Sequence, residues 1–93
     1  MATTNNPFGV CNSKYRVDKV IIDKGDFGWC LAKAYKYEDK KSHYVSRWNG
    51  GLRNDGTIDL GFPNGNGYPT WYQEPDDLNE IFENLEKMAE LVK

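Results

Sequence analysis

The sequence predicts an α+β fold in which an antiparallel β-meander of four to five strands carries one C-terminal amphipathic helix packed on one face. Between residues 15 and 49, three segments are rich in β-branched side chains or alternate along the chain, and turn residues separate them, which is typical of strands. Residues 75–93 instead place apolar side chains at helical spacing. Because such a helix must bury its apolar stripe, we expect it to lie across the sheet.

The chain of 93 residues has the length of one domain. Residues 1–13 are polar and show no periodicity, so we expect a flexible N-terminal tail followed by a single α+β domain over residues 14–93. A chain this short buries only roughly 60–65% of its extended surface, and its core is therefore thin. We expect a homodimer for that reason.

Three strands are predicted first, over residues 15–23, 27–37 and 42–49, with turns between them. Residues 27–37 alternate large and small side chains, which predicts one bulky and one tightly packed face. In the third strand, Arg47 and Trp48 must point to opposite faces. If the helix covers the Trp48 side, Arg47 faces outward; if it covers the other side, Arg47 must pair with an acid.

The remaining β-structure is shorter. Residues 57–62 predict a fourth strand, and residues 70–73 predict a short fifth strand or an extended edge. The loop between them, residues 63–69, is rich in glycine and proline and is expected to be irregular.

Charge is unevenly distributed along the chain. Residues 1–53 hold ten Lys/Arg and five Asp/Glu, a balance of +5, whereas residues 54–93 hold two and nine, a balance of −7. The sum is the net charge of −2. Such polarity is informative about partners, not about fold. The alternative is that each of the two segments simply has an ordinary solvated face, which would give the same charge distribution.

The pattern of reactive residues argues against catalysis, so we expect a protein that is not an enzyme and has no cofactor and no metal site. His43 is the only histidine and is predicted to be a surface strand residue, while Cys11 and Cys30 have no zinc-ligand spacing and are predicted to be free thiols. No nucleophile elbow, Walker loop or zinc-protease motif occurs. The opening residues lack the pattern of a signal peptide and no stretch is apolar enough to span a membrane, so we expect a cytoplasmic protein without a membrane partner.

Cations and aromatic rings are interleaved in the first half of the chain. This combination is typical of proteins that hold single-stranded DNA or RNA, with cations along the backbone and rings under the bases. The alternative is that the rings fill a thin core. The residues predicted for a nucleic-acid site are Arg16, Lys33, Tyr35, Lys36, Arg47, Trp48 and Arg53.

The order of elements resembles the positive-cofactor-four family of transcriptional coactivators and its bacterial relatives. The residues that carry the resemblance are Gly28-Trp29 opening a strand, the segment Ser46–Asn49 and a terminal amphipathic helix from Asp77. The resemblance implies a curved sheet that grips single-stranded DNA and a helix that mediates dimerisation. The insertion over residues 63–75 and the net acidity depart from the family pattern.

A protein-interaction or inhibitor module is the second hypothesis, as in accessory proteins of phages and other mobile elements. Its contact patch would be the glycine-rich loop over residues 61–69 and the aromatic residues around it, because Tyr and Trp are favoured anchors at protein interfaces. The alternative is that the rings of residues 71 and 72 close one end of the core. The residues predicted for this patch are Phe62, Tyr68, Trp71 and Tyr72.

Overall fold

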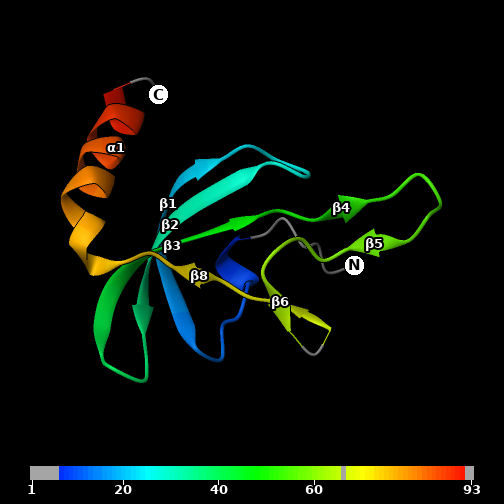
Figure 1. The fold of residues 1–93 in the computed structure, drawn as a ribbon, viewed down its shortest axis with the longest axis horizontal. Helices are drawn as coiled ribbons and strands as arrows, with labels where there is room; N and C mark the ends of the chain where they lie inside the picture. The colour runs from blue at the N-terminus through cyan, green and yellow to red at the C-terminus, as the bar shows by residue number, and fades with distance from the viewer. Residues whose placement is uncertain (1–6, 66, 92–93) are drawn as a thin grey trace.

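The computed structural model describes residues 7–65 and 67–91, and it confirms an antiparallel sheet followed by one C-terminal helix (Figure 1). The sheet has the order β1-β2-β3-β8. Its strands are β1 (Tyr15–Asp23), β2 (Trp29–Lys36), β3 (Lys41–Trp48) and β8 (Tyr72–Gln73). A 3₁₀ turn, η2 (Asp76–Leu78), leads into the helix α1 (Asn79–Leu91). Among the described residues, no helix has the length and apolar character that a membrane span needs.

The fourth strand of the sheet is not the one that the sequence favoured. The segment 57–62 contributes β5 (Ile58–Asp59), which pairs with β4 (Gly51–Leu52) in a separate hairpin, and touches β3 only through a single bridge from Phe62 to Trp48. The place next to β3 belongs to β8, through the pairs Val45–Gln73 and Ser46–Tyr72. The predicted irregular loop holds a second small hairpin, β6 (Asn64–Gly65) with β7 (Tyr68–Pro69). Both hairpins lie on the opposite side of the sheet from α1 (Figure 1).

The alternation in β2 separates two faces of the sheet. We call the side of Trp29, Leu31, Lys33 and Tyr35 the helix face, because α1 packs there against a cluster of buried side chains. That cluster contains Ile21, Leu31, Tyr44 and Phe82, with Leu85 and Ala89 of the helix at its border. We call the side of Cys30, Ala32 and Ala34 the loop face.

The loop face is covered by irregular chain. Its small side chains leave room for Pro7 of η1 (Pro7–Gly9), for Val10 and for Trp71, and all three residues are buried. The prediction of a flexible tail over residues 1–13 is therefore corrected for residues 7–13, since Val10 seals the core; residues 1–6 lie outside the described residues. The local sequence of residues 7–13 does not reveal the burial of Val10. That burial depends on packing against Ala32 and Ala34, which are distant in the chain.

The rotation of α1 about its axis is fixed by polar contacts. Glu86 accepts hydrogen bonds from the Lys19 ammonium at 2.8 Å and from the Tyr44 hydroxyl at 3.0 Å, and Glu90 also pairs with Lys19. The bond from Lys19 holds the pKa of Glu86 below its usual value. Burial, followed by the contact with Glu86, raises the pKa of Tyr44 to about 12. One side of the helix is thus tied to the row of residues that crosses the sheet at Lys19 and Tyr44.

His43 corrects a second expectation. It is buried on the loop face instead of lying at the surface, and its ring nitrogens lie 2.7 Å from an Asp39 carboxylate oxygen and 3.2 Å from one of Asp76. These contacts join the β2–β3 turn to the 3₁₀ turn before the helix. A buried imidazole needs such partners, and its partners come from distant segments that the strand pattern does not reveal.

Candidate binding surfaces

Arg47 is buried and is not exposed on either face of the sheet. The helix covers the Trp48 side, and the expectation that Arg47 then faces outward is wrong, because the residue is only 2% exposed. Its guanidinium donates to the backbone carbonyls of Leu60 and Thr70, while its Nε has no partner among the described residues. Desolvation lowers the pKa of Arg47, yet arginine keeps its charge in proteins. Carbonyl groups, not an acid, compensate the buried cation.

Three of the predicted nucleic-acid residues lie on neighbouring strands of the helix face. Arg16 pairs with Tyr35 across β1 and β2, and its guanidinium lies 4.7 Å from the centre of the Tyr35 ring. Lys33 is two residues away, with its ammonium 5.4 Å from the centre of the Tyr44 ring. We call Arg16, Lys33 and Tyr35 the basic cluster. Arg16 also forms an exposed ion pair with Asp18, which raises the pKa of the guanidinium.

The other predicted nucleic-acid residues are dispersed. Lys36 lies on the loop face and donates to Gln73 at 3.1 Å. Arg53 extends from the β4–β5 hairpin and contacts Asp59 at 3.4 Å. Trp48 is on the helix face, but at the opposite end of the strands from Tyr35. Together with the burial of Arg47, this distribution divides the predicted site into separate pieces.

Trp48 instead joins two residues predicted for the protein-interaction patch. Phe62 forms a backbone bridge with Trp48, and Tyr72 pairs with Ser46, so all three aromatic side chains project from the helix face. They come from β3, from the loop after β5 and from β8. Each remains exposed, at 55% for Trp48, 67% for Phe62 and 53% for Tyr72. We call these three residues the aromatic surface.

The helix extends this surface. Ile81 and Met88 are 57% and 62% exposed. They lie on the same side of α1 as Leu85, away from the side that Glu86 and Glu90 tie to Lys19. Trp29, level with Trp48 in the sheet, borders the cluster beneath the helix. Ile81 and Met88, which we call the helix flank, therefore face the end of the sheet that holds the aromatic surface.

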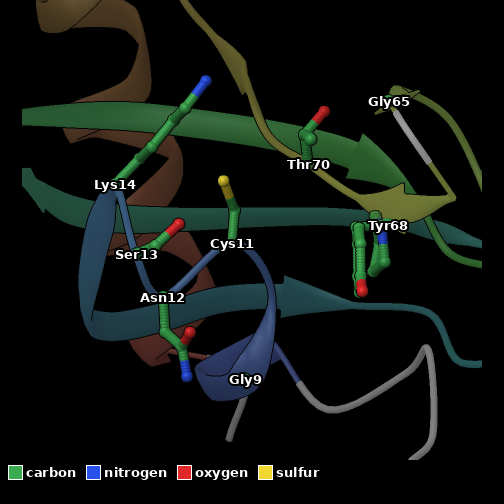
Figure 2. Close-up of a pocket in the computed structure, with 9 residues that line it drawn as sticks. Gly9, Cys11, Asn12, Ser13, Lys14, Gly65, Tyr68 and Thr70 are labelled. Carbon is green, nitrogen blue, oxygen red and sulfur yellow. The ribbon is translucent and has the colours of Figure 1, made fainter.

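Tyr68, another residue of the predicted protein-interaction patch, borders a cleft between the N-terminal segment and the β6–β7 hairpin. The cleft has a volume of about 550 Å³. Lys14 and Tyr68 stand at its opposite ends, with the Cys11 side chain between them (Figure 2). Tyr68 is thus exposed but lies apart from Phe62 and Tyr72. The cleft has the size of a small-molecule site, and Asn12, Ser13, Lys14 and Thr70 are the polar residues of its lining besides Tyr68.

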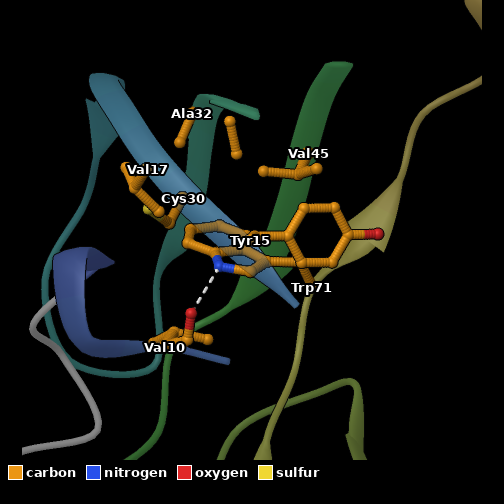
Figure 3. Close-up of a cluster of buried hydrophobic side chains, with 8 residues drawn as sticks. Val10, Tyr15, Val17, Cys30, Ala32, Val45 and Trp71 are labelled. Atoms are coloured by element: carbon orange, nitrogen blue, oxygen red, sulfur yellow. Dashed lines mark hydrogen bonds between the residues drawn. The ribbon is translucent and has the colours of Figure 1, made fainter. Parts of the chain in front are cut away.

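Trp71 cannot belong to the predicted protein-interaction patch, because it is buried. Its ring fills the loop-face core between Val10 and Tyr15, with Val45 beside it, and its indole N–H donates to the Val10 carbonyl at 3.0 Å (Figure 3). Only 6% of the residue is exposed. The alternation of a strand explains the outcome, because Trp71 and Tyr72 are neighbours and must point to opposite faces.

Neither cysteine forms a disulfide. Cys30 is buried in the loop-face core, and burial raises the pKa of its thiol to about 12, so the reactive thiolate is strongly disfavoured. Within residues 7–65 and 67–91, no three His, Cys, Asp or Glu side chains gather in a way that could hold a metal ion.

Comparisons with known proteins give no relative: no family model, no curated protein and no solved structure matches this chain. The resemblance to the positive-cofactor-four family therefore stays a prediction.

Sequence reasoning missed Ile81 and Met88 as surface residues. Both belong to the apolar stripe of the helix, and the stripe is wider than the part that contacts the sheet. The excess width was a signal, because a helix that only covers a small sheet needs a narrower apolar side.

Proposed function

We propose that this chain is a non-catalytic protein-binding module that uses the aromatic surface as its contact site. The observation that carries the proposal is the exposure of Trp48, Phe62 and Tyr72 on one face of one sheet. Three aromatic side chains, each more than half exposed, contribute roughly 300–400 Å² of ring surface. An area of this size is in the range of the largest apolar patch of a typical monomer, and such patches are often functional.

The sheet fixes the backbone from which these rings project. Trp48 ends β3, and the backbone bonds between Trp48 and Phe62 measure 2.7 and 2.9 Å, so the two residues are held side by side. Arg47 anchors the segment after Phe62 from the other face through the carbonyl of Thr70. A backbone that is ordered before binding loses little conformational entropy in the complex, which favours affinity.

The experiment that tests the proposal is affinity capture from the cells that naturally make the chain, followed by titration with the purified captured protein. We expect a partner whose dissociation constant rises at least about thirtyfold with Trp48→Ala, as for an aromatic hot spot. Phe62→Ala should weaken the same complex. Isothermal titration calorimetry measures both effects.

Tyr37→Ala is the matched control, since Tyr37 is an exposed aromatic residue just beyond the far end of β2. The proposal predicts no loss of affinity for this variant. Equal weakening by Tyr37→Ala and Trp48→Ala, or none by either, would contradict a contact site at the aromatic surface. Circular dichroism of each variant separates lost binding from lost folding.

The basic cluster supports a second candidate, binding of single-stranded nucleic acid at the opposite end of the sheet. Its supporting observation is the arrangement of Arg16 over Tyr35 with Lys33 nearby. Fluorescence anisotropy with a labelled oligothymidine at about 50 mM salt tests it, because phosphate contacts weaken steeply with salt. We then expect loss of binding with Lys33→Ala and Tyr35→Ala, and none with Trp48→Ala. Absence of binding at low salt would remove this candidate.

A further inference from the structure

Acidic residues border the proposed contact site. Residues 54–86, which supply Phe62, Tyr72 and Ile81, contain eight Asp/Glu and no Lys/Arg. Tyr72 is followed two residues later by Glu74, whose carboxylate accepts from Ser46 at 2.6 Å. Asp77 lies in η2, just before the helix, and Glu80 lies in the first turn of α1, next to Ile81 in the sequence. Both are exposed and make no ion pair within the part of the chain that the structure describes.

Two of the nearby cations are already engaged, and Lys87, which precedes Met88, lies about two helical turns beyond Glu80. Arg47 is buried under the carbonyls of Leu60 and Thr70. Lys19 is held by Glu86 and Glu90 on the other side of the helix. The exposed apolar residues thus stand beside carboxylates that are free to meet a partner.

The apolar area also indicates the kind of partner. Together, the aromatic surface and the helix flank expose roughly 500–600 Å², short of the ~800 Å² per partner of a standard interface. A contact of full size must therefore include the acidic border. A second copy of the chain docked symmetrically would bring this border against the same acids, and like charges across an interface are unfavourable.

We propose that the partner contacts this site with a cationic amphipathic segment, whose apolar side chains cover the aromatic surface and the helix flank and whose Lys or Arg side chains meet Glu74, Asp77 and Glu80. The inference rests on the proposed protein-binding function. Charge complementarity of this kind accelerates association and excludes acidic competitors.

Three fluorescein-labelled peptides, each roughly 18 residues or five helical turns long, test the inference. The first is amphipathic and built from Leu and Lys; the second has Glu at every Lys position; the third has the composition of the first in a scrambled order with no apolar side. Fluorescence anisotropy with the full chain measures each dissociation constant. We expect the Leu/Lys peptide to bind at least about tenfold more tightly than either of the others.

Variants of the chain locate the contact. The double change Asp77→Asn with Glu80→Gln should weaken the Leu/Lys peptide by about threefold for each carboxylate, the range of exposed charge pairs. Glu38→Gln is the matched control, since Glu38 is an exposed acid in the β2–β3 turn, at the other end of the strands. It should leave the affinity unchanged. Trp48→Ala should weaken the peptide as well.

The outcomes distinguish failure of the cationic-partner inference from failure of the proposed protein-binding function. If the Leu/Glu or scrambled peptide binds as tightly as the Leu/Lys peptide, or if Asp77→Asn with Glu80→Gln has no effect, the cationic partner is ruled out. Should Trp48→Ala still weaken binding in that case, the protein-binding site itself stands. If Trp48→Ala changes none of the three affinities, the proposed function fails together with the inference.

Discussion

The two faces of the sheet are covered in different ways. On the loop face, Cys30, Ala32 and Ala34 are small, and irregular chain closes over them with Val10 and Trp71. On the helix face, α1 covers the middle around Leu31 and leaves the end at Trp48 open. Small side chains let backbone segments approach closely, whereas a helix is ~10–12 Å wide with its side chains and covers only part of the sheet. The loop face therefore buries Trp71, whereas the helix face keeps Trp48 and Tyr72 exposed beyond the part that the helix covers.

Neighbouring aromatic residues on β8 and just before it give the strongest test of this comparison. Trp71→Ala should lower the free energy of unfolding by about 3–5 kcal/mol, because it empties the loop-face core and removes the bond to the Val10 carbonyl. Tyr72→Ala, on the helix face, should cost less than about 1 kcal/mol. Urea denaturation measures both. Similar losses would mean that the two faces do not differ in stability.

Arg47 probes the polar part of the loop face. Arg47→Met keeps much of the side-chain volume but leaves the carbonyls of Leu60 and Thr70 without their donor, and should destabilise by about 2–4 kcal/mol. Arg53→Met, on the exposed hairpin, serves as the control and should change little. Unchanged stability of Arg47→Met in thermal unfolding would indicate that water replaces the guanidinium.

Gly61 tests the turn that brings Phe62 beside Trp48. Its φ is +80°, and an added Cβ would collide with the Trp48 carbonyl and the Arg47 guanidinium. Gly61→Ala should therefore cost about 2 kcal/mol or more. Gly67→Ala is matched in φ at +80° but has open space around it, so only the smaller backbone term of about 1 kcal/mol is expected. Equal losses in chemical denaturation would show that crowding at Gly61 is relieved by local shifts.

The attachment of the helix should depend on pH. Because the folded pKa of Glu86 is lowered, its contribution is present above the unfolded value of 4.5 and is lost as pH falls through the folded pKa. Glu86→Gln should cost about 1 kcal/mol at pH 7, and the difference from the unmodified chain should shrink below pH 4. Glu83→Gln is the control and should show neither effect. A pH-independent difference in urea denaturation would contradict the role assigned to the Glu86 carboxylate.

Periodicity predicted much of the fold. Residues 15–23 form β1 as expected, and the alternation of residues 27–37 correctly indicated a bulky and a small face. The strand predicted over residues 57–62 is wrong because pairing, not propensity, selects the fourth strand. Ile58 and Asp59 pair with β4 and Phe62 makes a single bridge to β3, whereas β8 is the fourth strand of the sheet.

The candidate site was less predictable. The sequence required Arg47 and Trp48 to project to opposite faces, and they do. It did not indicate which of these faces stays open, because Arg47 is covered by a segment more than ten residues away in the chain. Trp71 and Tyr72 were grouped as one patch, and only β8 pairing beside β3 assigns one to the core and the other to the surface.

By itself, the sequence determined the strand periods, the helix and the acidic second half, because these follow from the order of side chains along a local backbone. The tertiary structure decided that Trp71 and Arg47 are buried and that the helix leaves Trp48 exposed. These outcomes depend on contacts between segments far apart in the chain, whose geometry no local pattern contains.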